Sequence, residues 1–484
     1  KEVALLGPES SRFKEIQAVM TKAGIQQRDA SFQVLVKAGV WTPHENLSLL
    51  RNKVPIRFRD ELLEAAQALV ETFATGDWKG LHRLDLTALD AVTIDDAHTV
   101  ETDDAVSIRR LDQGWEVGVH IADPAELVEK GSAIDREALH RGTSIYFPDQ
   151  KIPMLPPLIG TDLCSLKAGE DRPALSLLAV LDDEANVLET RIVESTVRVT
   201  RRLTYDDVDG ALLASTNEGL TRLHDLAMRL RARRLANGAV FVPFPSVEVH
   251  VEMGADDEPH IEVARAERDS PSQVLVSELM ILANQAVARY LSENGIPALY
   301  RGQPPPSEPV TFGETFTPLD GFRVRRFLKK SETSLHPIAH SGLGLDAYVQ
   351  FTSPIRRYLD LVLHRQLKSH LRGAPLAYTR QEVEQISYIT STCSEQADHM
   401  ERERKAYWIY RHLESLVWRE LRAVVLQAFP DRYHVQLVDT LVETDCANVP
   451  HAPVSPGDVI DVKVDIVFPR DGVVRVSALV APAR

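Results

Sequence analysis

Residues 93–105 concentrate five carboxylates into ten positions, between two segments with the composition of β-strands. Residues 89–94 are mostly apolar, and residues 105–108 lead through an Asp-Gln-Gly turn at 112–114 into an alternating strand at 115–121. Like charges this close repel unless water or a cation screens them. Hard oxygen ligands suit Mg²⁺, which takes one or two carboxylates and leaves positions for phosphate oxygens and water. The feature predicts an acidic site at the mouth of a β-hairpin.

Two other interpretations of this cluster are a solvated acidic turn and a calcium-binding loop. An EF-hand loop has a glycine in its middle and regularly spaced acidic ligands, and no glycine lies between Asp95 and Ala105. The cluster alone does not decide between the solvated turn and the magnesium site. The motifs that follow it do.

The acidic cluster is the first of five motifs that occur in a fixed order. The others are Gly-Val-His-Ile-Ala-Asp at 118–123, Arg-Gly-Thr-Ser-Ile-Tyr-Phe-Pro-Asp-Gln-Lys-Ile-Pro-Met-Leu-Pro at 141–156, Leu-Cys-Ser-Leu at 163–166 with Asp-Arg-Pro-Ala-Leu-Ser at 171–176, and Phe-Thr-Ser-Pro-Ile-Arg-Arg-Tyr at 351–358. In this order and spacing the series resembles the ribonuclease II / ribonuclease R (RNB) family of 3′→5′ exoribonucleases. The resemblance covers roughly residues 85–410. One such motif is weak evidence, and the ordered set is strong.

The resemblance implies a Mg²⁺-dependent enzyme that hydrolyses single-stranded RNA processively from a free 3′ end and releases nucleoside 5′-monophosphates. Asp95, Asp103 and Asp104 would hold the metal and orient the attacking water. The family normally has a fourth aspartate where this chain has Glu101. The longer side chain is compatible with coordination through a water, or with a weaker second metal. We expect an active enzyme, and the alternative is a catalytically impaired RNA-binding or regulatory protein on the same scaffold.

Arg356 is a candidate catalytic residue on two grounds. Ser353 and Pro354 have the pattern of a helix start, with Ile355, Leu359 and Val362 on the buried side. This pattern places Arg356 in the first turn, where free backbone N–H groups and the helix dipole favour an anion. Its guanidinium would add a bidentate grip on phosphate, and the resemblance assigns the matching arginine to the scissile region. An ion pair with a structural carboxylate is the other interpretation.

Three further residues are implied as RNA contacts. By resemblance, Tyr146 would stack on the 3′-terminal base, a contact that tolerates any base because every base has a π-face. A second aromatic contact would come from Phe241 or Phe244, and we take Phe241. The family also has a functional glutamate near the start of its long C-terminal helix. Glu401 and Glu403 are the candidates here, and we favour Glu401.

Charge and composition set limits on the partner. The formal net charge is −15, which disfavours indiscriminate binding of nucleic acid on an open surface. An enzyme that threads one strand into a tunnel needs only a local positive lining. Basic stretches at 201–202, 229–234 and 323–330 are compatible with such a lining, and each is also compatible with a solvated face.

Cysteine usage and hydropathy predict where the protein works. Three scattered cysteines argue against a disulfide framework or a zinc site, so we expect a reducing, cytoplasmic setting. No run of about 18 or more apolar residues occurs, so we expect no membrane-spanning segment. We also expect a monomer.

The chain divides into three predicted domains of an α+β multidomain protein. Residues 1–80 have the pattern of short helices with tight turns, typical of a helix-turn-helix module, and Thr42 to Glu45 has the form of a capping-box helix start. Such a module could also bind duplex DNA, which is a third interpretation of the function. Residues 81–412 would form the α+β catalytic domain. The helical module at 1–80 departs from the family, whose members usually begin with β-barrel cold-shock domains.

Residues 413–484 alternate as about five short strands around Pro and Gly turns, which predicts an OB-fold β-barrel that binds RNA. Phe429, Tyr433 and His434 are compatible with base stacking. Each is equally compatible with the barrel core.

Overall fold

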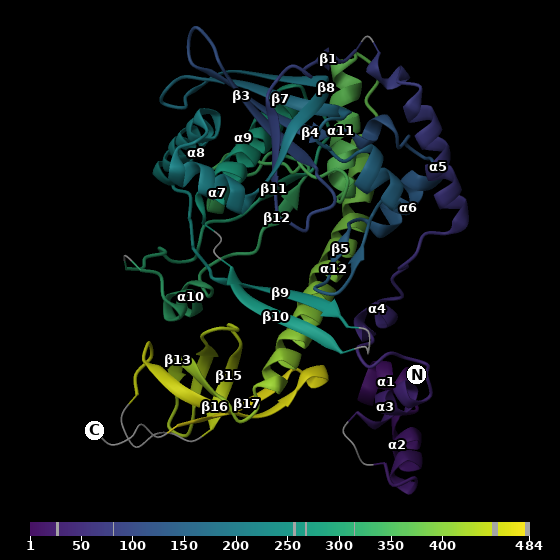
Figure 1. The fold of residues 1–484 in the computed structure, drawn as a ribbon, viewed down its shortest axis with the longest axis vertical. Coiled ribbons are helices and arrows are strands. Elements are labelled where there is room, and N and C mark those ends of the chain that lie inside the picture. The colour runs from purple at the N-terminus through teal and green to yellow at the C-terminus, as the bar shows by residue number, and fades with distance from the viewer. Residues whose placement is uncertain are drawn as a thin grey trace.

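The computed structural model describes residues 1–25, 29–80, 82–254, 258–266, 269–313, 315–447 and 454–479. A mixed α/β body forms one end of the molecule, and the first helices and the C-terminal barrel lie at the other (Figure 1). The 36-residue helix α12 (Arg380–Ser415) runs between the two ends. It contacts α6 (Ala133–Arg141) and α11 (Tyr358–Leu371) in the body, α4 (Leu47–Asn52) of the N-terminal part and β16 (Val459–Phe468) of the barrel. This helix therefore connects all three parts of the protein.

A six-stranded sheet in the order β1-β8-β2-β3-β4-β7 is the centre of the body. Its longest strand, β8, pairs with β7 along its first half and with β1 and β2 along its second, so the sheet curls back on itself. The strands are β1 (Leu84–Asp85), β2 (Ala91–Asp95), β3 (Asp104–Arg110), β4 (Trp115–Ala122), β7 (Asp171–Leu181) and β8 (Val187–Thr204).

The predicted hairpin at the acidic cluster is confirmed. β2 and β3 pair antiparallel through Val92 and Val106, and β3 continues into β4 through the turn at residues 111–114. Residues 96–103 form the loop that joins β2 to β3. The predicted first strand starts two residues later than expected, because Ala91 donates its amide to the carbonyl of Leu89 in a tight turn.

Helices cover the sheet on two sides. One apolar core joins the sheet to α7 (Tyr205–Ala214), α8 (Glu218–Ala236) and α9 (Pro271–Glu293). By length and apolar content α9 is a candidate membrane span among the described residues, but most of that stretch is buried and packs on α8, as a core helix does. The second core joins the other side of the sheet to α5 (Asp60–Ala74), α6 (Ala133–Arg141), the π-helix η4 (Leu158–Leu163) and α11 (Tyr358–Leu371).

The N-terminal residues are helical, as predicted, in α1 (Glu2–Leu6), α2 (Phe13–Lys22), α3 (Ala30–Lys37), α4 (Leu47–Asn52) and α5. The predicted helix start at Thr42 is wrong. Glu45 does accept hydrogen bonds from the amide and hydroxyl of Thr42, as in a capping box, but these bonds close a turn. Asn46 caps α4 instead, because its side chain accepts from the amides of Ser48 and Leu49.

The predicted module 1–80 contributes to two different cores. Leu62 and Ala66 of α5 are buried in the body, whereas α4 contacts the C-terminal half of α12. Glu403 on α12 accepts hydrogen bonds from Ser48 and Arg51, each at 2.6 Å. The predicted boundary at residue 412 falls within α12, three residues before its end.

The C-terminal residues form a closed barrel in the order β13-β14-β15-β17-β16, which confirms the predicted OB-type barrel. Tyr433 is a core residue of this barrel, and His434 pairs with Asp445 at 3.0 Å. Phe429 lies under the guanidinium of Arg432. The strands are β13 (Glu420–Ala428), β14 (Tyr433–Leu437), β15 (Glu443–Ala447), β16 (Val459–Phe468) and β17 (Val473–Ala478).

Three short two-stranded sheets and one helix complete the fold. The β9–β10 ribbon crosses beside α12 between the body and the barrel (Figure 1). These elements are β5 (Ile145–Tyr146), β6 (Lys151–Ile152), β9 (Ser246–Met253), β10 (Pro259–Ala266), β11 (Tyr300–Gly302), β12 (Glu332–Ser334) and α10 (Pro318–Val324).

Candidate active site

The hairpin brings three of the predicted carboxylates to one place. Asp95 ends β2, Asp104 begins β3, and Asp103 directly precedes Asp104. Burial, together with the neighbouring Asp95 and Asp103 carboxylates, raises the pKa of Asp104 to about 8. Burial is also the main cause that raises the pKa of Asp95 to about 7 and that of Asp103 to about 6. Ionised carboxylates are therefore costly in this site unless a cation joins them.

The donor set fits a divalent metal ion. Oδ2 of Asp95 is buried and has no hydrogen-bond partner among the residues that the structure describes. A buried carboxylate oxygen left unpaired is expensive, and a hard cation would satisfy it. Asp95, Asp103 and Asp104 are the residues that would hold such an ion here.

Arg356 lies against this acidic group, as the sequence predicts. Its Nε donates to Oδ2 of Asp103 at 3.2 Å, and the amide of Ile355 donates to Oδ1 of the same carboxylate at 3.1 Å. The side chain of Arg356 is 40% exposed, so its outer face is free to meet a ligand. The ion pair with a carboxylate and the contact with a phosphate are thus compatible rather than alternatives.

The predicted helix start at Ser353 is wrong, and α11 begins at Tyr358. Residues 353–356 form a turn, and Arg357 is extended because it bridges to Thr143 in β-type pairing. The carbonyl of Arg356 accepts hydrogen bonds from the amide of Ser144 and the hydroxyl of Thr143. Hydrogen bonds to Thr143 and Ser144, rather than the first turn of a helix, therefore position Arg356.

Tyr146 and Glu401 are in contact with each other and line the same cavity as Arg356. The carboxylate of Glu401, on α12, accepts a hydrogen bond of 2.7 Å from the amide of Tyr146. The ring of Tyr146 is partly exposed, and its hydroxyl donates to Oε2 of Glu101 at 3.3 Å. Glu401 is thus the glutamate that faces the site, while Glu403 binds helix α4 of the N-terminal part.

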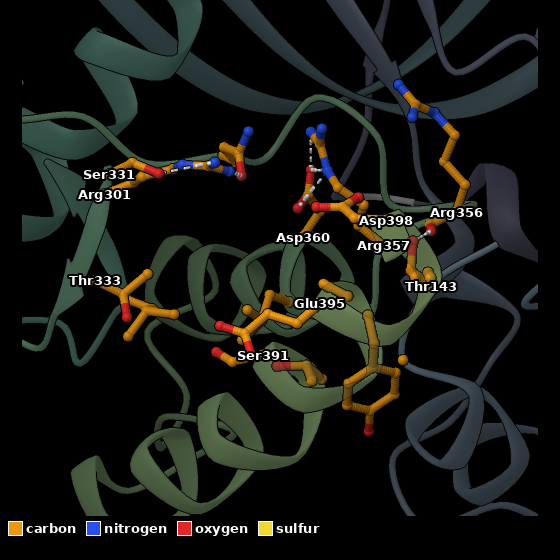
Figure 2. Close-up of a pocket in the computed structure, with 18 of the residues that line it drawn as sticks. Thr143, Arg301, Ser331, Thr333, Arg356, Arg357, Asp360, Ser391, Glu395 and Asp398 are labelled. Atoms are coloured by element: carbon orange, nitrogen blue, oxygen red, sulfur yellow. Dashed lines mark hydrogen bonds and ion pairs between the residues drawn. The ribbon is translucent and has the colours of Figure 1, made fainter. Parts of the chain in front are cut away.

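A cavity of about 1040 Å³ opens beside Tyr146 and Arg356. Figure 2 shows Arg301 and Ser331 on one wall, Arg357 with Asp360 next to Arg356, and Glu395 with Ser391 on α12. The cavity lining thus mixes positive and negative side chains. Arg356 lines this cavity and also contacts Asp103, so the cavity adjoins the acidic group through that arginine.

The structure places the remaining sequence candidates elsewhere. Phe241 and Phe244 are not among the described residues that line this cavity. The ring of Phe241 lies under the guanidinium of Arg231, and Phe244 packs edge-on against Phe316. Of the basic stretches, 323–330 reaches the cavity through Lys330.

Sequence reasoning missed two positions in the site. Arg301 lines the cavity and donates to Gln350, and it lies in a stretch without a motif. Asp360 accepts from the amide of Ser353 at 2.9 Å and from the guanidinium of Arg357, so it holds the turn that carries Arg356. The one feature of the sequence that could have indicated Asp360 is its position two residues after the end of the last motif.

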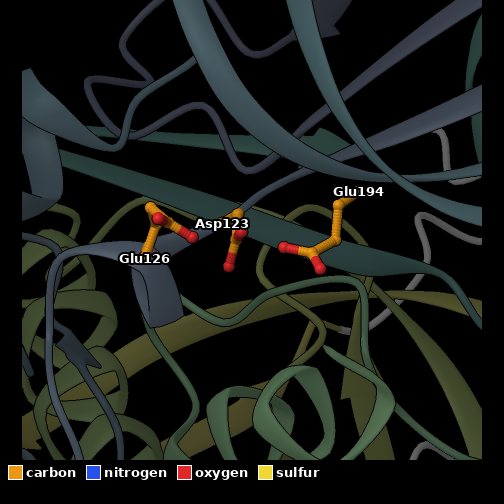
Figure 3. A group of neighbouring side chains, drawn as sticks. All are labelled: Asp123, Glu126 and Glu194. Carbon is orange, nitrogen blue, oxygen red and sulfur yellow. The ribbon is translucent and has the colours of Figure 1, made fainter. Parts of the chain in front are cut away.

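A second acidic group lies nearby and has a different character. Asp123, Glu126 and Glu194 place carboxylate oxygens within 4.8 Å of one another (Figure 3). Lys368 binds both Asp123 and Glu126 at 2.7 Å, and Arg83 binds the same two residues. Burial alone would raise the pKa of Asp123, but Lys368, His364 and Arg83 hold it well below its usual range. Lysine and arginine side chains already neutralise these carboxylates, so the group is a structural ion-pair network rather than a metal site.

Replacing Lys368 by Met should lower the free energy of unfolding by about 3–5 kcal/mol, because it removes one of the two cations that Asp123 and Glu126 share and leaves part of their buried negative charge uncompensated. The measurement is urea unfolding with and without Mg²⁺. Lys130→Met is the matched control, since Lys130 pairs with Glu382 at the surface, and such a change is usually within about 0.5 kcal/mol. A stability of Lys368→Met that Mg²⁺ fully restores would instead identify a metal site.

Comparison with known proteins gives consistent matches. A family model described as RNB domain matches residues 83–373, and one described as double HTH domain matches residues 1–47. The uncharacterized ribonuclease sll1290 of Synechocystis sp. is 35% identical across 99% of this chain and 72% of its own length. The chloroplastic/mitochondrial ribonuclease II of Arabidopsis thaliana is 32% identical across 94% of this chain and 58% of its own length. The chain thus spans less than two thirds of the second relative.

Solved structures share the fold. Ribonuclease R of Mycoplasma genitalium, in complex with ribose-methylated single-stranded RNA, superposes with a TM-score of 0.78 at 22% identity, over 90% of this chain and 77% of that one. The Dss1 exoribonuclease of Candida glabrata gives a TM-score of 0.81 at 22% identity, over 98% and 68%. Yeast Ssd1, described as a pseudonuclease, gives 0.59 at 20% identity, over 81% and 52%. At these identities the likeness is one of fold.

Proposed function

This chain belongs to the RNB family of exoribonucleases, and we propose that it hydrolyses single-stranded RNA from a free 3′ end with the help of Mg²⁺. It would work processively and release nucleoside 5′-monophosphates. The observation that carries the proposal is the meeting of Asp95, Asp103 and Asp104 with Arg356 beside a cavity that Tyr146 also lines. A phosphodiester group at that point would contact cationic, metal-holding and stacking groups together.

Each residue has a distinct task in this proposal. A divalent metal would supply charge neutralisation and a more acidic water. Arg356 binds a phosphoryl oxygen through its exposed guanidinium edge, and Asp103 keeps that guanidinium oriented. Tyr146 presents its ring to the terminal base. Glu401 fixes the backbone beneath that ring.

The alternative is a catalytically impaired RNA-binding or regulatory protein on the same fold. The observation that favours it is Glu101 in place of the family aspartate, since its carboxylate faces Tyr146. The fold does not decide, because both an exoribonuclease and a pseudonuclease share it with this chain. The retained Asp95, Asp103 and Asp104 support the active enzyme.

One assay separates these functions and the third, a duplex-DNA regulator acting through residues 1–80. Three substrates of one sequence are incubated with Mg²⁺ or with a chelator: RNA with a free 3′ end, RNA with a blocked 3′ end, and duplex DNA. The proposal expects mononucleotides from the first substrate alone, and only with Mg²⁺. Binding of RNA without products would indicate the impaired protein, and a preference for duplex DNA would indicate the regulator.

Four further statements stay predictions. They are a monomeric state, a cytoplasmic location, independence from a membrane, and the domain boundaries at residues 80 and 412. Sedimentation of the purified protein at several concentrations would test the first of them.

A further inference from the structure

The strand pair β5–β6 carries Tyr146, and it pairs that residue directly with Lys151. Nζ of Lys151 lies 5.2 Å from the centre of the Tyr146 ring. A cation at this distance from an aromatic ring is attracted to it. Lys151 is thus the cross-strand neighbour of the residue that is proposed to stack on RNA.

Lys151 also binds Glu101. Its Nζ lies 2.7 Å from Oε2 of Glu101, the oxygen that accepts from the Tyr146 hydroxyl. The Glu101 side chain is 4% exposed and that of Lys151 is 27% exposed. A carboxylate buried to this degree needs a charged partner, and Lys151 supplies it. Glu101, Lys151 and Tyr146 therefore form a closed triangle of contacts.

The surroundings leave Glu101 little freedom to turn elsewhere. A Cβ built at Gly160 would come within 3.3 Å of Oε1 of Glu101 and within 3.3 Å of Ile355, so the backbone of η4 lies directly against the carboxylate. An aspartate at position 101 would be one methylene shorter, so from the same backbone position its carboxylate would lie further from Nζ of Lys151 and from the Tyr146 hydroxyl. The longer side chain is what allows the triangle to close.

We propose that Lys151 and Glu101 together act as positioning residues for Tyr146, and that Glu101 in this chain serves the RNA end rather than the metal. Lys151 anchors the carboxylate, and the carboxylate fixes the hydroxyl end of the ring. Tyr146 is then held at both ends of the residue, since its backbone amide also donates to Glu401 at 2.7 Å. The inference rests on the proposed function, because it assigns Tyr146 to the 3′-terminal base.

The first test measures RNA affinity without metal, so that no turnover is needed. A short RNA with a free 3′ end is titrated in chelator against the wild type, Lys151→Met, Glu101→Gln and the double variant. Each single variant should raise Kd by about 5- to 10-fold, as loss of part of one stacking contact would. The double variant should match either single one, because both remove the same contact. Lys151→Arg, which keeps the charge, should restore most of the affinity.

The second test measures the Mg²⁺ concentration that gives half-maximal hydrolysis. Our proposal expects the same concentration for wild type, Lys151→Met and Glu101→Gln, with KM raised more than kcat is lowered. If Glu101 were a metal ligand, Glu101→Gln would raise that concentration. Lys151→Met would then lower it, since a competing cation has been removed. These opposite shifts would overturn the proposal.

Lys130→Met is the matched control. Lys130 also pairs with a glutamate, Glu382, at 2.7 Å and also lies over a tyrosine ring, that of Tyr378, but outside the site. It should leave Kd and KM at the wild-type values. If the wild type hydrolyses RNA and Lys151→Met equals it in both constants, the positioning role is wrong and the proposed function stands. If the wild type neither binds nor hydrolyses RNA, the proposed function itself fails.

Discussion

Asp104→Asn is expected to abolish the hydrolysis of RNA, with kcat lowered by at least about 10³-fold. The amide keeps the shape of the side chain but removes the charge that would hold a divalent cation at the start of β3. RNA affinity in chelator should be unchanged, because Asp104 is not among the described residues that line the cavity. The measurement is single-turnover hydrolysis of a labelled RNA alongside a binding titration.

Asp90→Asn is the control for this variant. Asp90 directly precedes β2, at the end of that strand opposite Asp95, and pairs with Arg201 on the surface. It should retain wild-type rates. Wild-type turnover in Asp104→Asn would show that the acidic group has no part in the reaction.

Asp104→Asn should also be more stable than the wild type at pH 8 without metal. The pKa of Asp104 is about 8 in the folded protein, against an ordinary value of 3.8. The folded state therefore binds more protons than the unfolded state between these values, so the free energy of unfolding falls as pH rises through that window. Asn removes this loss, and Tm at pH 8 in chelator should rise on the order of 3–5 °C. At pH 4 the difference should vanish, and a higher wild-type Tm at pH 8 would contradict the account.

Arg356→Gln is expected to lower kcat by about 10²–10³-fold, because it removes a fixed guanidinium from the phosphoryl group. The effect on Kd for RNA should be much smaller, since other cations line the cavity. Arg356→Lys should recover only part of the rate, because an ammonium cannot make the two parallel contacts of a guanidinium. Single-turnover rates for the three proteins check this order.

Arg198→Gln is the control for the arginine variants. Arg198 also donates through Nε to an aspartate, Asp171, at 2.7 Å, and its side chain is 51% exposed. Its loss removes an ion pair of similar exposure outside the site, which is worth little in water. Equal losses in Arg198→Gln and Arg356→Gln would mean that Arg356 has only a general effect on the protein.

Patterns with a strict period could be predicted from the sequence. The hairpin at the acidic cluster and the C-terminal barrel follow from the alternation of apolar residues and the turns between them, and both are confirmed. The order of the five motifs identified the family, which the match over residues 83–373 confirms. These features depend on local sequence, so neighbouring residues suffice to reveal them.

Features that depend on distant contacts could not be predicted. The turn at Ser353 had every local mark of a helix start, but pairing between Arg357 and Thr143 delays α11 to Tyr358. The capping box at Thr42 failed for a local reason instead, because Asn46, four residues further on, provides the cap of α4. Lys151 lies within the motif at 141–156, but the sequence alone assigned it no role, and the pairing of β5 with β6 is what brings it to Tyr146.

The central claim is that the acidic group beside Arg356, and not the neighbouring one, holds the metal. Crystals soaked in Mn²⁺, which replaces Mg²⁺ at oxygen sites and scatters anomalously, test it directly. We predict an anomalous peak among Asp95, Asp103 and Asp104, adjacent to the guanidinium of Arg356. A peak among Asp123, Glu126 and Glu194 instead, in crystals of an enzyme that hydrolyses RNA with the same metal, would contradict it.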